Sequence, residues 1–521
     1  MNSPVKKVVV VGGGAAGWIT AGVIAAEHNA KLDSGIEVTL IESPDVATIG
    51  VGEGTWPTMR KTLSKLGISE TGFIRDCDAS FKQGTRFDRW HTASEDDAYY
   101  HPFTLPHDYI KTNLAASWQS MRDRISFADA VGVQSNLCAR NLAPKQAATP
   151  EYAAVVNYAY HLDAGKFAEL LQKHCTLELG VTHILDHVTG INADAEGDIA
   201  SLSSKEHGEI HGDLFIDCTG FASLLLGKHY EVPFVSRKNT LFIDTALAVQ
   251  VPYADADSPI ASQTISTAQN AGWIWDIGLS SRRGVGYVYS SAHTSDEKAE
   301  QELRAYIEPA LGKDAAPASL RKISINPGHR EQFWHRNCVA VGMAAGFLEP
   351  LEASALVLVE LSAQMISEQL PATRETMSIV ARRFNEKFRY RWDRVIDFLK
   401  LHYVLTERTD SEFWIENCQK NTIPDSLQEL LTIWRYHVPW HGDFTRVDEV
   451  FSSASYQYVL YGMGFRTEPR ATTQRSVNAE SAARLFQENA EKTRKLLAGL
   501  PTNRDLINQI KEFGLPKGKV A

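Results

Sequence analysis

The 521-residue sequence lacks the features that define several large classes of protein. Its six cysteines form no CxxC pair, so the sequence shows neither the ligand spacing of a zinc site nor a disulfide framework. Free thiols are typical of a reducing compartment, which predicts a cytoplasmic protein without a bound metal. The net charge of −10 gives no support for nucleic-acid binding, which usually requires a basic surface.

Long hydrophobic runs are also scarce. Only residues 8–26, which follow Lys6 and Lys7, have the apolar character of a signal peptide or a membrane span. A glycine triplet interrupts this segment, and no other run approaches the ~20 apolar residues that a spanning helix needs. We therefore expect no membrane association. The content of 44% hydrophobic and 22% charged residues is ordinary for a globular protein.

The N-terminal residues have the pattern of a βαβ unit. An apolar β-branched run over 6–12 predicts a buried strand, and a glycine turn, a small-residue helix and a second strand over 37–43 follow it. Gly12, Gly14 and Gly17 form a G-x-G-x-x-G motif. Such glycines permit a tight turn, the approach of a pyrophosphate and close packing of the helix on the strand.

The end of the second strand supports a dinucleotide site. Glu42 lies there, where a carboxylate suits the ribose hydroxyl of an adenosine. The βαβ unit alone does not distinguish FAD from NAD. Two later stretches favour FAD, because DLFIDCTGF (213–221) and VAVGMAAGFLEP (339–350) resemble segments of two-domain flavoproteins. No second G-x-G-x-x-G indicates a separate NADPH domain, so the electrons would arrive on a flavin reduced elsewhere.

The rest of the chain predicts an α/β, two-domain flavoprotein with an FAD-binding Rossmann-like part and an added, mostly helical substrate-covering part. Strand patterns fill the middle of the sequence, and helical spacing dominates from about residue 370. We predict a discontinuous FAD-binding module that includes a mixed sheet (1–95 with 155–365) and a mainly helical substrate-binding part (96–154 with 366–521).

One lysine has an unusual setting. The stretch ASFKQGTRF (79–87) has the pattern of a strand, and Lys82 lies between apolar neighbours. A lysine in this pattern usually points to water or extends its stem along an apolar surface. The alternative is an amine placed in a pocket for chemistry.

Taken together, these stretches resemble the flavin-dependent tryptophan halogenase family over nearly the whole chain. The resemblance rests on GGGAAGWITA, IGVGEGTWP, FKQGTRF, YYHPF, DLFIDCTGFASLL, GWIWDIG, GFLEPLEAS and DFLKLHYVLTERTDSEFW. It implies an enzyme that takes reduced FAD from a separate NAD(P)H-dependent flavin reductase. With oxygen and a halide ion, chloride or bromide, the family makes hypohalous acid and halogenates a small electron-rich aromatic substrate. Indole or an indole derivative such as tryptophan is the expected substrate.

The resemblance assigns the catalytic roles to Lys82 and Glu352. Lys82 aligns with the lysine to which hypohalous acid is guided. Because burial disfavours the charged form of a lysine, it could act as a hydrogen-bonding ammonium or form a haloamine as a neutral amine. Glu352 aligns with the carboxylate that stabilises the cationic ring and accepts its proton. Glu349 is a rival for this role.

The halide is expected on the backbone amides of Ser354 and Ala355. The family often has Glu-Ser-Thr-Gly or Glu-Ser-Thr-Ser where this chain has Glu352-Ala-Ser-Ala. The small residues still allow an anion to approach the backbone. The change from serine to Ala353 removes one hydroxyl near the glutamate.

The resemblance also assigns the flavin side of the site. The residues expected to bind the cofactor are Gly12, Gly14, Ala15, Ala16, Gly17, Glu42, Glu53, Val188, Met343 and Leu356. Met343 replaces the acid that many members carry, so a ribityl contact through that side chain is lost. Trp273 and Trp275 match a W-x-W-x-I-P signature, with Gly278 in place of proline, and are expected near the flavin. An aromatic core strand is the alternative.

The substrate side includes His101 and Phe103, which match positions that face the indole, and His402 in LHY. A lone histidine is more often structural, which is the alternative for His402. The segment FSSASYQYVLYGMGF (451–465) lacks the anchors that hold free tryptophan, and Tyr458 and Tyr461 are candidates for a different lining. Indole, a substituted indole or a tryptophan within a larger molecule is at least as good a candidate as free tryptophan.

Two other functions fit parts of the sequence. A flavin-dependent aromatic monooxygenase would share the fold but would not need Lys82, and a non-catalytic flavin-binding protein would need neither Lys82 nor Glu352. The FKQGTRF stretch and the absence of an NAD(P)H site argue against the first alternative. The resemblance is compatible with a homodimer, and it leaves the preference between chloride and bromide open.

Overall fold

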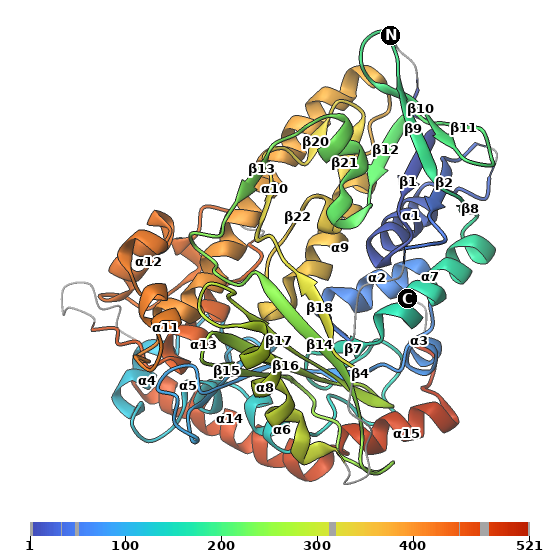
Figure 1. Ribbon diagram of the computed structural model, residues 1–521. Helices are drawn as coiled ribbons and strands as arrows, with labels where there is room; N and C mark the ends of the chain where they lie inside the picture. The colour runs from blue at the N-terminus through green and yellow to red at the C-terminus, as the bar shows by residue number, and fades with distance from the viewer. Residues whose placement is uncertain are drawn as a thin grey trace. The chain divides into compact units, whose positions relative to one another are not determined.

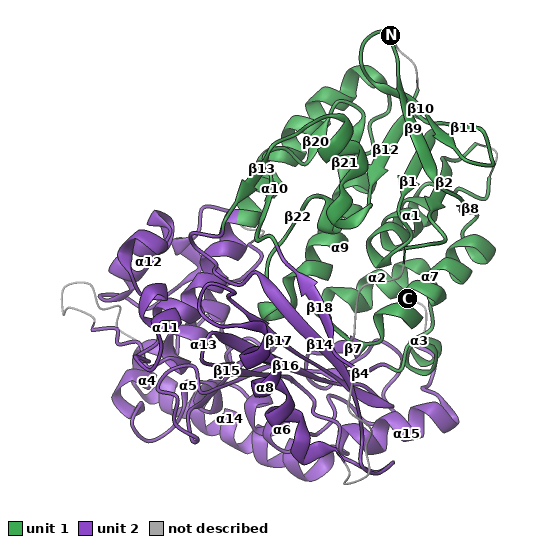
Figure 2. Ribbon diagram, viewed as in Figure 1, with its two compact units in different colours: residues 1–78, 162–237, 326–392 green, residues 79–161, 238–325, 393–521 purple. Residues whose placement is uncertain are grey.

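The structure is a computed structural model that describes residues 4–32, 34–46, 52–311, 319–446, 449–468 and 479–518 (Figure 1). The chain divides into two compact units, each built from three separate segments (Figure 2). Unit 1 comprises residues 1–78, 162–237 and 326–392, and unit 2 comprises residues 79–161, 238–325 and 393–521.

A six-stranded, mainly parallel sheet forms the centre of unit 1. In spatial order its strands are β20 (Trp334–His335), β21 (Cys338–Ala340), β12 (Leu214–Asp217), β1 (Lys7–Val11), β2 (Glu37–Glu42) and β8 (Thr182–Leu185). Only β20 runs antiparallel to its neighbour. The central strand β1 pairs with β2 and β12, and its four valines are almost completely buried. A buried central strand of this kind explains the uninterrupted β-branched run in the sequence.

In the described part of the chain, five α-helices lie wholly in unit 1 and pack with one another. They are α1 (Ala15–Glu27), α2 (Thr58–Leu66), α3 (Glu70–Asp76), α7 (Ala164–Glu178) and α9 (Ser354–Glu368). Helix α1 contacts α2, α7 and α9 as well as β1 and β2 of this sheet, and its glycines and alanines permit this close packing. Two small antiparallel sheets complete the unit: β9 (Val188–Ala193) with β10 (Ile199–Ser204) and β11 (Glu209–His211), and β13 (Phe234–Ser236) with β19 (Gly328–Arg330) and β22 (Gly346–Phe347).

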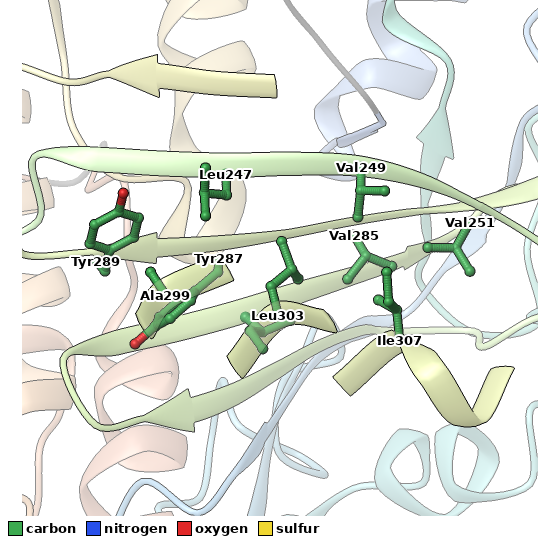
Figure 3. Close-up of a cluster of buried hydrophobic side chains, with 10 residues drawn as sticks. Leu247, Val249, Val251, Val285, Tyr287, Tyr289, Ala299, Leu303 and Ile307 are labelled. Atoms are coloured by element: carbon green, nitrogen blue, oxygen red, sulfur yellow. The ribbon is translucent and has the colours of Figure 1, made fainter. Parts of the chain in front are cut away.

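Unit 2 is built on a seven-stranded sheet. In spatial order its strands are β18 (Arg321–Ser324), β14 (Thr245–Pro252), β17 (Arg282–Tyr289), β16 (Gly272–Gly278), β15 (Thr264–Gln269), β5 (Gly84–Asp88) and β6 (Ala98–Pro102). On one face, alternate residues of β14 and β17 pack against helix α8 (Asp296–Ile307) (Figure 3). Leu247, Val249 and Val251 follow the period of a strand, and Ala299, Leu303 and Ile307 follow the period of a helix.

The compact units do not coincide with the predicted division of the chain. We expected residues 79–95 and 238–325 in the FAD-binding module, but both segments belong to unit 2. The reason is the pairing of β5 with β15, which joins two distant segments in one sheet. Residues 366–392, expected in the helical part, belong to unit 1.

The C-terminal part is helical, as the sequence predicts. It contains α10 (Arg374–Val404), α11 (Glu412–Asn417), α12 (Asp425–Trp434), α13 (Ser453–Gly462), α14 (Ala479–Gly499) and α15 (Asn503–Phe513). Within the described ranges, no helix is both long and apolar enough to cross a membrane. The same residues contain no cluster of three or more histidine, cysteine or acidic side chains that could hold a metal ion.

A buried glutamate joins α2 to α9. Glu360 on α9 is 5% exposed, and its carboxylate accepts hydrogen bonds from Oγ1 of Thr58, at 3.0 Å, and from Oγ1 of Thr62. Burial raises the pKa of Glu360 to about 7, because a charged carboxylate is disfavoured away from water. The two threonine hydroxyls oppose this shift by stabilising the carboxylate.

Glu360 should therefore make the free energy of unfolding depend on pH. Its pKa is higher in the folded protein than the ordinary value of 4.5, so its contribution is fully present below pH 4.5 and is lost as the pH rises through 7. From pH 6 to pH 8, wild type should lose about 1 kcal/mol relative to Glu360→Gln. Urea unfolding of both proteins at both pH values measures this, and an equal pH dependence would contradict it.

Candidate active site

The three motif glycines of unit 1 have different structural roles. Gly12 has φ +111°, and a Cβ there would lie 2.3 Å from the carbonyl oxygen of Cys218. A Cβ on Gly17 would lie 1.9 Å from the carbonyl oxygen of Gly12. At Gly14, by contrast, a Cβ would meet no protein atom within 4 Å. Gly12 and Gly17 therefore serve the packing of the turn, whereas the space beside Gly14 is open.

Helix α1 begins at this turn with unused hydrogen-bond donors. Gly14 is its N-cap and provides no side-chain cap, and the first turn, which includes Ala15 and Ala16, contains no acidic residue. The first amides of a helix have no partner inside the helix, and the helix dipole favours an anion beside them. The turn thus fits a phosphate or pyrophosphate group.

Glu42 lies beside the glycine turn, at the end of β2. A Cβ on Gly13 would lie 1.5 Å from a carboxylate oxygen of Glu42, so this side chain passes directly over the turn. Its other oxygen lies 2.8 Å from Nε2 of His183. Burial raises the pKa of Glu42, and His183 offsets part of this shift. A carboxylate at this place can accept a hydrogen bond, and its contact with a ribose hydroxyl stays a prediction.

The other residues expected at the flavin also belong to unit 1. Glu53 is half-buried in β3 (Glu53–Gly54), and Val188 is the half-buried first residue of β9. Met343 lies in a short turn, 3.7 Å from where a Cβ of Gly220 would be, and Leu356 is buried in the first turn of α9. Residues 49–51 of the IGVGEGTWP stretch lie outside the described residues. Their contact with flavin stays a prediction.

A tight turn with unusual backbone geometry carries Glu352. Glu352 and Ala353 have φ values of +63° and +53°, which place two consecutive non-glycine residues in the left-handed region. This conformation is rare for such residues and is found mostly at functional sites. Glu352 is 6% exposed. Its carbonyl oxygen accepts a hydrogen bond of 2.7 Å from Nε1 of Trp56, and the N–H of Ala353 donates to the Pro350 carbonyl.

The same turn leads into helix α9. Ala353 is the N-cap, without a side-chain hydrogen bond, and Ser354 is the first helical residue. Ser354 is buried, whereas Ala355 is exposed. The rival carboxylate, Glu349, is buried as deeply as Glu352, so burial does not decide between them. Only Glu352 has the left-handed backbone.

In unit 2, Lys82 is buried. It lies at the end of β4 (Ser80–Lys82), which pairs with β7 (Ala159–Leu162), and its partner across the strands is Ala159. Lys82 is 1% exposed, so the interpretation of a lysine that points to water is wrong. The ammonium nitrogen lies 5.5 Å from the ring centroid of Phe103, in a cation–π contact.

A glycine brings the two predicted substrate residues, His101 and Phe103, to the segment that directly follows Lys82. Gly84 has φ +153°, and a Cβ there would lie 2.5 Å from the carbonyl oxygen of His101. Only glycine therefore allows β6 to approach β5 so closely at this point. The resulting register pairs Thr85 with His101 and lets the Phe103 amide donate to the Gln83 carbonyl.

Aromatic side chains surround His101, which is 7% exposed. Its ring centroid lies 5.5 Å from Phe398, 6.2 Å from Tyr458 and 6.4 Å from Phe451. Phe398 and Phe451 stack on each other at 3.7 Å. Neither phenylalanine is among the predicted substrate residues, although Phe398 lies in the stretch 397–414 and Phe451 in the stretch 451–465. The hydroxyl of Tyr458 donates to the Thr104 carbonyl, and the hydroxyl of Tyr461 bonds to Thr467, so a substrate contact of either tyrosine stays a prediction.

Comparison with known proteins identifies the family. Residues 7–479 match the family described as tryptophan halogenase. The chain belongs to the tryptophan halogenase family. It is 32% identical to the tryptophan 6-halogenase SttH of Streptomyces toxytricini, over 95% of this chain and 96% of that protein.

Solved structures agree with this assignment. The tryptophan halogenase from Shewanella frigidimarina is 51% identical, with 99% of each chain covered and a TM-score of 0.95. Tar14, a tryptophan C-6 flavin-dependent halogenase from taromycin biosynthesis, is 33% identical, with a TM-score of 0.89 over 97% of this chain and all of that one. The chain is therefore a flavin-dependent halogenase with the two-domain flavoprotein fold.

His402 of this halogenase is completely buried among aromatic rings. Its Nδ1 lies 2.6 Å from the hydroxyl of Tyr99, and its ring stacks on Phe87 at 4.7 Å. Trp90 and Phe398 contact it edge-on. These contacts are those of a structural histidine, and a contact with substrate stays a prediction.

The two tryptophans of the W-x-W stretch lie on one face of β16. Trp273 is 1% exposed and lies 6.2 Å from Trp90, within the aromatic core of unit 2. Trp275 is less buried and covers Gly286 on the neighbouring strand, where a Cβ would lie 2.1 Å from its indole. The core interpretation therefore holds for Trp273, and a place for either indole near the flavin stays a prediction.

The glycine turn gives a matched pair of variants. Gly17→Ala should lower the free energy of unfolding by about 1–3 kcal/mol, because the added methyl overlaps the Gly12 carbonyl. Gly14→Ala should change it by less than about 1 kcal/mol, because its methyl meets no protein atom. The Gly14→Ala methyl should nevertheless weaken FAD binding about tenfold or more, because it occupies the space expected for the pyrophosphate. Urea unfolding and fluorescence titration with FAD test both expectations, and unchanged FAD affinity in Gly14→Ala would remove the pyrophosphate from this turn.

Proposed function

We propose that this halogenase uses reduced FAD, oxygen and a halide ion to halogenate the indole ring of a small molecule, and that Lys82 delivers the halogen. The observation that carries the proposal is the burial of Lys82 beside Phe103 in a member of the tryptophan halogenase family. An amine that is 1% exposed is rare in a protein interior, and such groups are kept mostly where they have a function.

Unit 1 holds the flavin in this proposal. The open space at Gly14 and the amides of α1 receive the pyrophosphate, and Glu42 accepts the ribose hydroxyl. The bound flavin supplies the electrons that activate oxygen, and a separate NAD(P)H-dependent flavin reductase provides it in reduced form. The amides of Ser354 and Ala355, at the start of α9, hold the halide, since this helix end has no side-chain cap.

Lys82 receives hypohalous acid in the dry interior of unit 2. As an ammonium it donates a hydrogen bond to the acid and polarises the halogen. As a neutral amine it forms an N–halogen bond, and the hypohalous oxygen leaves as water. In both cases the aromatic ring of the substrate attacks the halogen. Glu352 then stabilises the cationic ring and accepts the proton that the ring loses.

The substrate side favours an indole. Phe398, Phe451 and Tyr458 supply aromatic surface around His101, and Phe103 places a ring beside Lys82. Such surroundings suit a flat electron-rich ring. Proteins similar to this chain are described as tryptophan halogenases, so tryptophan, free or within a larger molecule, is a candidate together with indole itself.

Mass spectrometry tests the function directly. The purified protein is combined with a flavin reductase, FAD, NADH, oxygen and either bromide or chloride, and indole and tryptophan are supplied separately. A product with the isotope pattern of a halogen, formed only with intact protein, supports the proposal. An oxygenated product without halogen would favour an aromatic monooxygenase instead.

Lys82 variants test the residue that delivers the halogen. Lys82→Met, which keeps most of the buried volume, and Lys82→Ala should lower the yield of halogenated substrate at least ~100-fold, because the group that directs the halogen is absent. Both variants should still consume reduced flavin. They should also still form hypohalous acid when halide is present, which a small-molecule trap detects. Substrate halogenation at the wild-type rate in either variant would contradict the assignment.

A further inference from the structure

Within unit 1, the peptide bond after Glu352 is held at both ends. Its carbonyl oxygen accepts the hydrogen bond from the indole Nε1 of Trp56, at 2.7 Å. Its N–H, which belongs to Ala353, donates to the carbonyl of Pro350 at 2.9 Å. The plane of this peptide is therefore fixed by two hydrogen bonds, one from within the turn and one from a side chain distant in sequence.

This peptide joins the two left-handed residues of the turn. Left-handed backbone costs about 1 kcal/mol or more for each non-glycine residue, so the conformation persists only where its surroundings maintain it. The turn ends at Ala353, the N-cap of α9. The methyl side chain of Ala353 makes no hydrogen bond that would hold the turn in place. The bond from Trp56 comes from a side chain almost 300 residues away in sequence and reaches the backbone of the turn directly.

The segment that carries Trp56 also holds α9 at a second, separate place. Helix α2 begins two residues after Trp56, and Thr58 and Thr62 on α2 donate hydrogen bonds to Glu360. Glu360 lies more than one helical turn beyond the residues of the turn. These threonine contacts fix the packing of α2 on α9 but do not touch the peptide after Glu352.

We propose that Trp56 is a positioning residue that holds the Glu352 turn in its active geometry, and thereby sets the direction of the Glu352 carboxylate and of the Ser354 and Ala355 amides. This inference rests on the proposed roles of Glu352 as the catalytic carboxylate and of the two amides as the halide site. It adds a residue that contacts neither halogen nor substrate and acts through one hydrogen bond to a backbone carbonyl.

The chemistry explains why one hydrogen bond matters here. Without the indole N–H, the partly buried carbonyl of Glu352 loses its donor, and the peptide plane can rotate to find another. Rotation of this plane changes ψ of Glu352 and φ of Ala353 together. The amides that follow then lose their common direction, so affinity for a small anion falls, and the carboxylate turns away from the position in which it accepts the ring proton.

The test is the variant Trp56→Phe, which removes the N–H and keeps an aromatic ring. In the assay with flavin reductase, reduced FAD and indole or tryptophan, the KM for bromide or chloride should rise about tenfold, the loss expected for one hydrogen bond to a constrained group. The kcat at saturating halide should also fall, whereas FAD affinity should stay at the wild-type value. Chlorine-35 NMR line broadening, measured with FAD but without turnover, should show weaker chloride binding.

Two further variants separate positioning from simple loss of structure. Thr58→Val removes a hydrogen bond between the same segment and α9 at Glu360, so it should lower the thermal midpoint without changing the KM for halide. Trp56→His restores a ring N–H and should recover part of the halide affinity that Trp56→Phe loses.

The outcomes distinguish this inference from the proposed function. If wild type forms no halogenated product, the proposed function fails. If wild type halogenates and Trp56→Phe has the wild-type KM and kcat, the positioning role is wrong and the proposed function stands. Equal changes in the halide KM of Trp56→Phe and Thr58→Val would also overturn the positioning role, because they would show a general effect of loosened packing.

Discussion

The burial of one amine is the constraint on which the substrate side of this halogenase depends. Burying the amine of a lysine away from water costs free energy. Groups that interact favourably with the nitrogen offset part of this cost. Phe103 offers the negative face of its ring 5.5 Å from the nitrogen of Lys82. That contact requires β6 to lie against β5, which in turn requires Gly84, because any Cβ there would collide with the backbone at His101. The FKQGTRF stretch is thus one structural unit: it carries the lysine of the proposed halogen transfer, and its glycine makes the surroundings of that lysine possible.

The predicted ligand contacts fall largely into separate compact units. Apart from Trp273 and Trp275, which belong to unit 2, the residues predicted to contact flavin or halide lie in unit 1, where a parallel sheet ends in helix N-termini that favour anions. Lys82 and the residues predicted to line the pocket of the aromatic substrate lie in unit 2, where strands and helices carry many aromatic side chains. This division follows from physical chemistry, since backbone amides suit phosphate and halide, and apolar faces suit indole. Of the residues proposed to act on the substrate, Glu352 is the one that belongs to unit 1.

Local patterns predicted part of this arrangement, and long-range pairing explains the rest. The role of Gly17 depends on its close neighbour Gly12 within the strand–turn–helix, so the spacing of the glycines revealed it, whereas the contact of Gly12 with the Cys218 backbone is long-range. Lys82 could be recognised only by resemblance, because its burial depends on strands that no local pattern specifies. The division into units was missed for the same reason, since the parallel pairing of β5 with β15 joins segments almost 180 residues apart. Phe398 and Phe451 meet His101 from distant segments, and their spacing in sequence carries no signal of that contact.

The turn at Glu352 shows how a departure in sequence can be compensated in space. Where related halogenases often have a serine after the glutamate, this chain has Ala353, with φ +53° and no hydroxyl to bond to the turn. A left-handed alanine has no intrinsic means to hold that conformation. The indole N–H of Trp56 reaches the carbonyl of the same turn from a different segment and supplies a hydrogen bond from outside. In the proposed role of Trp56, the geometry of the Glu352 turn depends less on the Glu-Ala-Ser-Ala sequence itself than on a tryptophan almost 300 residues earlier in the chain.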